Sequence, residues 1–269
     1  MKAPRTVLMG VLNVTPDSFS DGGRFMGVEA ALIQAERLIA EGAAIIDIGG
    51  ESTRPYSRPV SLEVELARTI PVVEAIVRRH PGLRLSIDTT KAEVARLALA
   101  AGAGIINDVS ALRADPDMAE VVARSGAGVV LMHMQGSPAD MQVAPAYGDV
   151  VGEIAAFLEG RVAFAKARGI PRERLMVDPG LGFGKTLEHN LAILRGLARF
   201  RELGCPVLVG PSRKGFLGAV CGAETHARDA ATAACVALCV AGGADAVRVH
   251  DVRVAREAAL LAEALATAV

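Results

Sequence analysis

Polar side chains stand at or near the ends of a series of short apolar runs along this 269-residue chain. In chain order they are Asn13, Asp47, Asp88, Asn107, His133, Asp178, Lys214, Arg248 and His250. A buried polar group without a partner costs about 1–3 kcal/mol. One such residue fits a paired structural group, whereas a polar residue at the end of every run is better explained by a functional site.

Several candidate side chains are hydrogen-bond donors, and most of them are cationic. Arg54 follows the second run, and Lys214, Arg248 and His250 belong to the last two. Together they suit a polyanion such as a diphosphate, because arginine binds phosphate oxygens through two parallel N–H donors. Asn13 adds a neutral oxygen, which suits a hydrated Mg²⁺ held mainly by substrate phosphates.

A second group of residues has a different chemistry. Asp88, Asn107 and Asp178 supply two carboxylates and an amide, with no thiol beside them. This set suits a flat heterocycle with several N–H donors, and a guanidine-like ring edge would match Asp88 or Asp178 in bidentate fashion. We therefore expect a ring at the bottom of the site and a diphosphate at its mouth.

The first loop carries more functional groups than a turn requires. The stretch VLNVTPDSFSDGG, residues 11–23, contains one asparagine, two aspartates, two serines and a single phenylalanine. A connecting loop needs only turn-forming residues. This composition indicates a loop that has something to bind.

Several other signals have local explanations. PGLGFGKT, residues 179–186, resembles a phosphate-binding loop but is one residue short between its glycines, so we interpret it as a tight strand-to-helix turn. Lys214 could form a Schiff base, but its neighbouring arginine and the diphosphate set favour a charge role. His133 is ambiguous, because a core histidine is at least as common as a ligand. Asp47 is interpreted as structural within its strand, and Glu51 as a cap or a partner of Arg54.

The apolar runs predict strands. They cover residues 7–14, 44–50, 83–89, 104–110, 128–134, 175–180, 206–212 and 246–252. Most are nearly continuous in apolar residues, as strands buried on both faces are. Stretches of helical period lie between them and repeatedly end in glycine.

Eight strand–helix units predict the α/β fold of a (β/α)₈ TIM barrel, as a single domain over residues 1–269. The rival is a doubly wound open sheet, which usually has fewer units and a glycine-rich first turn. Active sites of such barrels lie at the carboxyl ends of the strands, where the polar residues stand.

Composition narrows the class of protein. The net charge of −1 gives no electrostatic basis for binding nucleic acid or an anionic membrane. The four cysteines (Cys205, Cys221, Cys235 and Cys239) match no zinc or redox spacing and are expected to be buried thiols. With no recognisable signal peptide or membrane span, we expect a soluble, cytoplasmic protein. The apolar stretch 231–243 is expected to be deeply buried or to form a dimer interface.

The motifs together resemble those of the dihydropteroate synthase family. In the family's order they are MGVLNVTPDSFSDGG, DIGGESTRP, SIDTTK, IINDVS, LMHMQGSP, DPGLGFGK, GPSRKG and RVHDV. They run from the first predicted strand to the last. The family condenses 6-hydroxymethyl-7,8-dihydropterin diphosphate with p-aminobenzoate, giving 7,8-dihydropteroate and diphosphate in folate synthesis. Its members are homodimers, and sulfonamides mimic their p-aminobenzoate.

The resemblance implies a role for individual residues of this chain. The implied pterin contacts are Asp88, Asn107, Asp178, Lys214 and Arg248, the last also reaching phosphate. The implied Mg²⁺-diphosphate group is Asn13, on the metal, with Arg54 and His250. The implied frame of p-aminobenzoate is Phe19, Thr53, Arg54, Pro55 and Phe183. The first loop would close as a lid and bring Asp21 to the reacting centre.

The expected mechanism is a dissociative displacement. Diphosphate departs once Mg²⁺, Arg54, Arg248 and His250 absorb its charge, leaving a methylene cation conjugated with the pterin. Asp88 and Asp21 would stabilise that cation, and the neutral aniline nitrogen would attack it at close range.

Two rival functions and three departures accompany this prediction. A corrinoid-dependent pterin-binding methyltransferase domain shares the barrel but has no need of the first loop or the diphosphate group. A non-catalytic pterin-binding protein would be expected to have lost such residues. The departures are Tyr56 where glycine is common, Ala92 where proline is common and Gly215 where serine is common.

Overall fold

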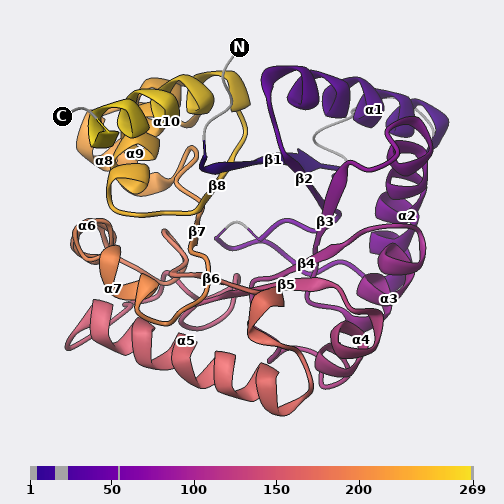
Figure 1. Ribbon diagram of the computed structural model, residues 1–269, viewed down its shortest axis with the longest axis horizontal. Helices are drawn as coiled ribbons and strands as arrows, with labels where there is room; N and C mark the ends of the chain where they lie inside the picture. Colours follow the sequence, from indigo (N-terminus) through magenta and orange to yellow (C-terminus); the bar gives the residue numbers. More distant parts are fainter. Residues whose placement is uncertain (1–4, 16–23, 54, 268–269) are drawn as a thin grey trace.

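The computed structural model describes residues 5–15, 24–53 and 55–267. Within these residues, strands lie at the centre and helices surround them (Figure 1). The strands are β1 (Val7–Asn13), β2 (Ile45–Gly49), β3 (Arg84–Asp88), β4 (Ile105–Asp108), β5 (Gly128–Met132), β6 (Leu175–Asp178), β7 (Leu208–Val209) and β8 (Ala246–Val249).

The helices follow the strands in alternation along the chain. They are α1 (Arg24–Glu41), α2 (Leu62–Arg79), α3 (Ala92–Ala100), α4 (Met118–Ser125), α5 (Val150–Ala167), α6 (Leu187–Arg195), α7 (Ala198–Arg201), α8 (Gly215–Cys221), α9 (Asp229–Ala241) and α10 (Val252–Thr267). Two short 3₁₀ turns, Arg172–Arg174 and Thr225–Ala227, precede β6 and α9.

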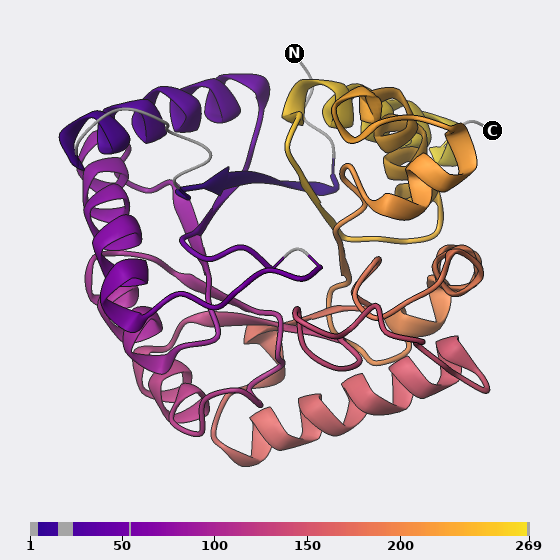
Figure 2. The same cartoon turned by 180° about the vertical axis from the view of Figure 1, so that it is seen from behind.

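The strands form one parallel sheet that closes on itself. Its order is β6-β5-β4-β3-β2-β1-β8-β7. A parallel bridge between Val177 and Val207, with the Val177 N–H donating to Pro206 O over 2.9 Å, joins β6 to the start of β7. The reverse view shows the same ring of helices around the strands (Figure 2). The predicted (β/α)₈ barrel is therefore confirmed, and the open doubly wound sheet is wrong.

Local signals in the sequence explain where several helices begin and end. Ser61 caps α2, since its Oγ accepts a hydrogen bond from the Val64 N–H over 3.4 Å. Gly42 and Gly102 follow α1 and α3 with φ of 110°, a conformation that favours glycine. These ends hold each helix at the length that returns the chain to the next strand.

Two apolar layers and one polar layer make up the barrel. A large apolar cluster fills the space between the strands and the helices. A smaller one inside the barrel consists of Met9, Ile45, Val130, Leu208 and Ala246. Farther toward the carboxyl ends of the strands, the interior positions carry polar side chains, including Asp47, Asn107 and Arg248.

Some strands are shorter than predicted. β7 has only two residues, because Pro206 and Pro211 lack the N–H that a sheet ladder needs. β5 ends at Met132, so His133 follows the strand rather than lying within it. The polar residues nevertheless stand at strand ends: Asn13, Asp88, Asp108 and Asp178 are the last residues of β1, β3, β4 and β6.

The cysteine prediction is correct for three positions and wrong for one. Cys205, Cys235 and Cys239 are buried, and Cys221 is exposed at the end of α8. α9 presents Cys235 and Cys239 to the interior but leaves Leu238 62% exposed. No helix in the described part of the chain is long and apolar enough to cross a membrane.

Candidate active site

A buried ion-pair network lies inside the barrel near the carboxyl ends of the strands. The Arg248 Nε donates to Asp47 Oδ2 over 2.6 Å, and its second guanidinium nitrogen donates to Asp88 Oδ2 over 2.7 Å. Asn107 Nδ2 also donates to Asp47 Oδ2, over 3.0 Å. The network joins β8, β2, β3 and β4. Asp47 holds the predicted ring-binding residues Arg248 and Asn107, and Arg248 in turn holds Asp88.

Asp47 was expected to be structural, and its contacts show that it holds two of the predicted site residues. It is completely buried and touches both Arg248 and Asn107. Its Oδ1 has no hydrogen-bond partner among the described residues. The sequence alone did not indicate this contact, because Arg248 lies 201 positions further along the chain.

The ionisation of Asp88 and Arg248 follows from burial and from each other. Burial raises the pKa of Asp88 to about 7, against the opposing effect of the Arg248 charge. For Arg248, burial lowers the pKa, but Asp47 and Asp88 outweigh it, so the pKa is raised and the guanidinium stays charged.

Asn13 lies beside this network. Gly49 lies between the Asn13 and Asp88 side chains. A Cβ placed on Gly49 would lie 3.6 Å from Asn13 Oδ1 and 3.6 Å from the Asp88 Cβ. No group of three or more His, Cys, Asp or Glu side chains that could hold a metal is found within the described ranges. The Asn13 amide oxygen and the nearby Asp88 carboxylate are oxygen donors of the kind that Mg²⁺ takes when water and phosphate supply its other ligands.

Asp178 forms the opposite wall of the site, at the end of β6. Its Oδ1 accepts a hydrogen bond from the Gly180 N–H over 2.7 Å. Burial raises its pKa to about 6, while that hydrogen bond and the charge of Lys214 act in the opposite direction. Its other oxygen remains available to accept N–H donors from a ligand.

Lys214 precedes α8 and lies close to Phe183. Its Nζ is 4.0 Å from the centre of the Phe183 ring, a cation–π contact. Burial lowers the pKa of Lys214 to about 8, while the charge of Asp178 acts to raise it. The preceding residue, Arg213, has φ of 57° and is held by an ion pair with Asp229 over 2.9 Å. The loop therefore fixes the direction in which Lys214 leaves the backbone.

His250 follows β8 and is held by a hydroxyl from the neighbouring loop. Its Nδ1 lies 2.9 Å from Ser212 Oγ, which also accepts from the His250 N–H over 3.2 Å. Ser212 thus fixes the plane of the His250 ring. Sequence reasoning placed Ser212 at a strand end but did not assign it this orienting contact.

The loop after β6 is a tight turn, as predicted from PGLGFGKT. Gly180, Gly182 and Gly184 have φ of 69°, 82° and 62°. A Cβ on Gly180 would lie 2.0 Å from His133 O, so only glycine permits this approach. Side chains of the β5 loop hold the turn, since Gln142 Nε2 donates to Gly182 O over 2.5 Å and the Tyr147 hydroxyl donates to Gly184 O over 2.9 Å.

The loop after β2 is anchored at its base. Lys91 forms ion pairs with Glu51 and with the buried Glu65, whose other oxygen accepts from the Thr89 hydroxyl over 2.6 Å. The Tyr56 N–H donates to Pro138 O over 2.9 Å, joining this loop to the β5 loop. Glu51 was expected to cap or to pair with Arg54, and the structure gives it Lys91 as a partner.

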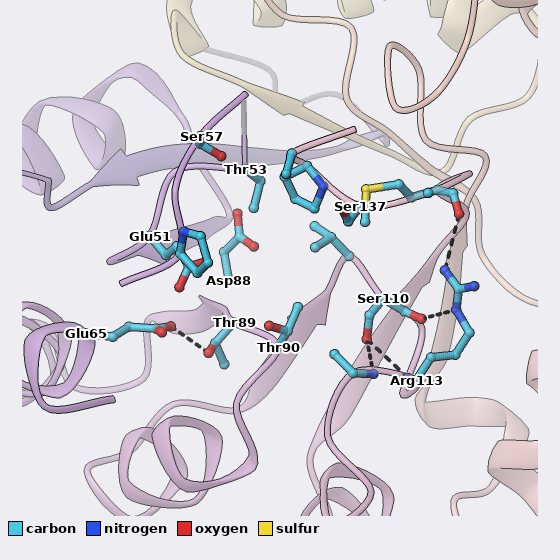
Figure 3. Close-up of a pocket in the computed structure, with 17 residues that line it drawn as sticks. Glu51, Thr53, Ser57, Glu65, Asp88, Thr89, Thr90, Ser110, Arg113 and Ser137 are labelled. Atoms are coloured by element: carbon cyan, nitrogen blue, oxygen red, sulfur yellow. Dashed lines mark hydrogen bonds between the residues drawn. The ribbon is translucent and has the colours of Figure 1, made fainter. Parts of the chain in front are cut away.

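A cavity of about 340 Å³ lies between these loops (Figure 3). Thr53 and Asp88 both line it, and the Asp88 carboxylate points toward Thr53. Further walls come from the β2 and β3 loops, from Glu65 of α2, and from the β4 and β5 loops, which include Ser110 and Ser137. Its size is that of a small-molecule site. Asn107, Asp178, Lys214 and Arg248 do not line this cavity, so it adjoins the ion-pair network rather than containing it.

The three departures have separate structural settings. Tyr56 has φ of 64°, in the region that favours glycine, and its side chain is exposed. Ala92 begins α3, and its N–H donates to Asp115 Oδ2 over 2.8 Å, a bond that proline could not make. Gly215 begins α8, and a Cβ there would meet nothing within 4 Å.

Three predicted site residues cannot be placed. Phe19, Asp21 and Arg54 lie outside the described residues. Pro55 is described but lies beyond the lining of the cavity, next to Tyr56. The structure therefore brings together one group (Asn13, Asp88, Asn107 and Arg248) and a second (Asp178, Phe183 and Lys214), with charges linking Asp178 to Arg248.

Comparison with known proteins gives one consistent result. A family model described as pterin binding enzyme matches residues 9–250. The dihydropteroate synthase of Synechocystis is 47% identical over 262 residues, covering 97% of this chain and 90% of that protein. A solved dihydropteroate synthase of Xanthomonas albilineans with 4-aminobenzoic acid has 48% identity and a TM-score of 0.92, covering 98% of this chain and 94% of that one. A Yersinia pestis dihydropteroate synthase in a sulfonamide drug complex has 43% identity and a TM-score of 0.92, covering 99% of this chain and 95% of that one.

Proposed function

Since the chain belongs to the dihydropteroate synthase family of pterin-binding enzymes, we propose that it joins a dihydropterin to p-aminobenzoate. The substrate would be 6-hydroxymethyl-7,8-dihydropterin diphosphate, and the products 7,8-dihydropteroate and diphosphate. The observation that carries this function is the meeting of buried carboxylates with an arginine and a lysine at one end of the barrel. Such a site can hold an uncharged ring and a polyanion at once.

The ring would be bound by the buried polar residues. Asp178 keeps one carboxylate oxygen free, which suits the adjacent N–H groups of a guanidine-like ring edge. Asn107 offers both an acceptor and donors, and its position is fixed by Asp47. Lys214, over the Phe183 ring, would donate to a ring oxygen or nitrogen. These contacts orient the ring so that its methylene group faces the mouth of the barrel.

The diphosphate would be bound by the cationic groups near β8. Arg248 uses two of its five N–H donors on Asp47 and Asp88, and the other guanidinium N–H groups would donate to a phosphate oxygen. His250, oriented by Ser212, would donate to phosphate from Nε2. Arg54, carried by the second loop, completes this proposed group.

Mg²⁺ is the proposed cofactor, and the Asn13 amide oxygen would hold it. The donor set fits an ion that keeps most of its ligands from water and substrate phosphates. When bound, the ion would supply charge neutralisation to the leaving diphosphate.

The reaction would proceed by departure of diphosphate before attack. The bond between the methylene carbon and the bridging oxygen breaks, and its electron pair leaves with the diphosphate. The aniline nitrogen then bonds to the carbon and releases a proton to water. Asp88, together with Asp21 from the first loop, would stabilise the cation between these steps. Phe19, Thr53, Pro55 and Phe183 would hold the aromatic amine against the carbon.

The similarities favour this function over its alternatives. A methyltransferase domain or a non-catalytic binding protein would not be expected to be about half identical, over nearly its whole length, to a synthase. No feature of the described residues favours either alternative. Because a similar enzyme has been solved with a sulfonamide, we also propose that sulfonamides compete with p-aminobenzoate here.

We further propose that the protein is a cytoplasmic homodimer. α9 and α10 pack against each other and leave Leu238, Leu261 and Leu265 exposed by 62%, 72% and 76%. Large exposed leucines on two packed helices support an interface with a second copy. Four free cysteines support a reducing compartment.

The test is to follow both products together. Purified protein, dihydropterin diphosphate, Mg²⁺ and p-aminobenzoate should yield dihydropteroate and diphosphate in equal amounts, and omission of either organic substrate should stop both. Asn13→Ala should abolish both products, and Lys166→Ala, at an exposed position of α5, should leave them unchanged. Tight pterin binding without product would contradict the synthase function and favour a binding protein.

A further inference from the structure

Lys185 is a buried cation that the proposed reaction does not use. It follows the glycine turn after β6 and is only 4% exposed. Its Nζ donates to Phe183 O over 2.8 Å, and it lies 3.1 Å from His133 Nδ1 and 3.4 Å from His133 O. All three partners are neutral protein atoms, and none of them belongs to the Asp178 carboxylate.

His133 is the acceptor that holds this cation. Burial, together with the charges of Lys185 and Arg113, lowers the pKa of His133 to about 3, so the ring is neutral. Its Nδ1 therefore accepts from the Lys185 ammonium group. The ring is packed edge-on against Phe157, with centroids 4.9 Å apart. The ambiguous histidine of the sequence is thus a buried support rather than a ligand of the substrate.

Asp178 is the carboxylate on which this charge acts. The His133 N–H donates to Asp178 O over 2.9 Å, and the Gly180 N–H donates to Asp178 Oδ1 over 2.7 Å. The cation and the carboxylate therefore lie on the same junction of β5 and β6. Each favours the charged form of the other: Lys185 lowers the pKa of Asp178, and Asp178 raises that of Lys185.

We propose that Lys185 is a positioning residue that keeps Asp178 ionised and fixes the Phe183 carbonyl, so that the substrate ring meets a carboxylate. This inference rests on the proposed function, in which Asp178 accepts the N–H groups of the pterin. The cation acts through Asp178 and does not touch the substrate. A buried charge with neutral contacts is costly, and an apolar side chain of equal length would fill the space without that cost.

The other cations near Asp178 have competing partners. The charges that face Asp178 are Lys214 from the β7 loop, Arg248 from β8 and Lys185 from the β6 loop. Arg248 is paired with Asp47 and Asp88, and in the proposed complex Arg248 binds the diphosphate and Lys214 the ring. Lys185 is only 4% exposed, and its contacts are with Phe183 and His133. It therefore keeps acting on Asp178 after the substrate has engaged the other two.

The charge of Lys185 lowers the pKa of Asp178. Burial raises the pKa of Asp178 to about 6, and Lys185, with its own pKa lowered to about 7 by burial, takes up a proton first as the pH falls. The resulting ammonium group opposes protonation of Asp178. Removing the charge should therefore raise the pKa of Asp178 further and cause the carboxylate to be lost at a higher pH.

The test separates charge from structure with three variants. Lys185→Met and Lys185→Gln both remove the charge, and Gln can still donate to Phe183 O. Tyr147→Phe removes a hydrogen bond to Gly184 O in the same loop and leaves the charge in place. Each protein, without substrate, is labelled at the aspartate carboxyl carbons and titrated by NMR, with the Asp178 signal assigned by its absence in Asp178→Asn.

Both Lys185 variants should move the Asp178 midpoint upward by about one pH unit. Tyr147→Phe should leave that midpoint where it is in the wild type. The acid limb of kcat/KM for dihydropterin diphosphate should shift in the same two variants. Asp88 titrates nearby, but the charges that act most strongly on it are Arg248, Asp47, Glu65 and Asp108, so its signal should stay in place.

Some outcomes would overturn the role of Lys185, and another would reject only the proposed function. An unchanged Asp178 midpoint in both Lys185 variants would overturn it. A shift in Lys185→Met that Gln reverses, or an equal shift in Tyr147→Phe, would assign Lys185 a packing role only and overturn it too. A shifted midpoint in an enzyme whose wild type forms no dihydropteroate would reject the proposed function while leaving the action of Lys185 on Asp178 established.

Discussion

At the scale of single residues, the site depends on carboxylates that burial has brought close to neutral pH. Asp178 and Asp88 are both buried and both have a raised pKa, to about 6 and about 7. Each must be ionised to accept N–H donors at both oxygens. The pKa of Lys214 is shifted in the opposite direction, since burial lowers it to about 8. The groups that bind the substrate therefore titrate within a narrow range around neutrality.

These values predict a bell-shaped pH profile of kcat/KM, which reports the free enzyme. Activity should fall as the pH drops through 7 toward 6, because the carboxylates take up protons. It should also fall as the pH rises through 8, because Lys214 loses its charge. The maximum is expected between about 7 and 8. A profile that is flat from pH 6 to pH 9 would contradict these assignments.

Asp178→Asn should lower kcat/KM for the dihydropterin substrate by about 100-fold. The asparagine side chain is the same size but has only one acceptor oxygen. The Gly180 N–H already donates to one oxygen of Asp178, so the asparagine would offer the substrate an NH₂ group where the aspartate offers an oxygen. KM for p-aminobenzoate should change little. The control is Asp117→Asn, at an exposed position before α4. Equal losses in the two variants, or an unaffected Asp178→Asn enzyme, would remove Asp178 from the proposed site.

At the scale of elements, the strands and the glycine turns place these residues. The loop after β6 folds closely against the end of β5, and Gly180 has no room for a side chain beside His133 O. By contrast, a Cβ on Gly215 at the start of α8 would meet nothing within 4 Å. The two glycines therefore differ in what they contribute.

Gly180→Ala should lower the free energy of unfolding by about 3 kcal/mol or more, since a Cβ there would lie 2.0 Å from a carbonyl oxygen at φ of 69°. Gly215→Ser should change it by less than about 0.5 kcal/mol. Urea unfolding followed by circular dichroism measures both. A tolerated alanine at position 180 would mean that the turn is not held as tightly as described.

Much of the element arrangement could be predicted from the sequence, and the reasons are local. Continuous apolar runs such as residues 44–50 identify buried parallel strands, and Ser61 marks a helix start. The lengths of β7 and β5 could not be predicted as well, because the extent of each strand depends on its pairing with the neighbouring strands. The polar residues were found because most of them stand at or near the end of an apolar run, a position that can be read from the sequence.

The contacts between those residues were not visible in one dimension. Asp47 was assigned to the strand itself, yet it holds Arg248 from 201 positions away. Lys185 was part of a turn motif, yet it meets His133 across 52 positions. Pairing of β8 with β1 and of β1 with β2 creates the first contact, and pairing of β5 with β6 creates the second, so only the structure reveals them. Phe19, Asp21 and Arg54 stay predictions, because they lie outside the described residues.

At the scale of the whole molecule, the barrel exposes an apolar surface on α9 and α10, which lie together on one side (Figure 1). We predict that Leu261→Glu shifts the protein from dimer to monomer, because a charge in an apolar interface is unfavourable. Sedimentation measures the change. Leu191→Glu, at a leucine of α6 that is 42% exposed, is the matched control and should keep the dimer. A wild type that sediments as a monomer would contradict the proposed interface.

In the proposed reaction, diphosphate leaves the methylene carbon of the pterin at the mouth of this barrel. The most direct measurement uses dihydropterin diphosphate with ¹⁸O in the bridging oxygen, mixed with the protein, Mg²⁺ and p-aminobenzoate. Mass spectrometry should find all of the label in the released diphosphate and none in dihydropteroate, formed in equal amount. Label that stays on the pterin, or diphosphate released without dihydropteroate, would contradict the account.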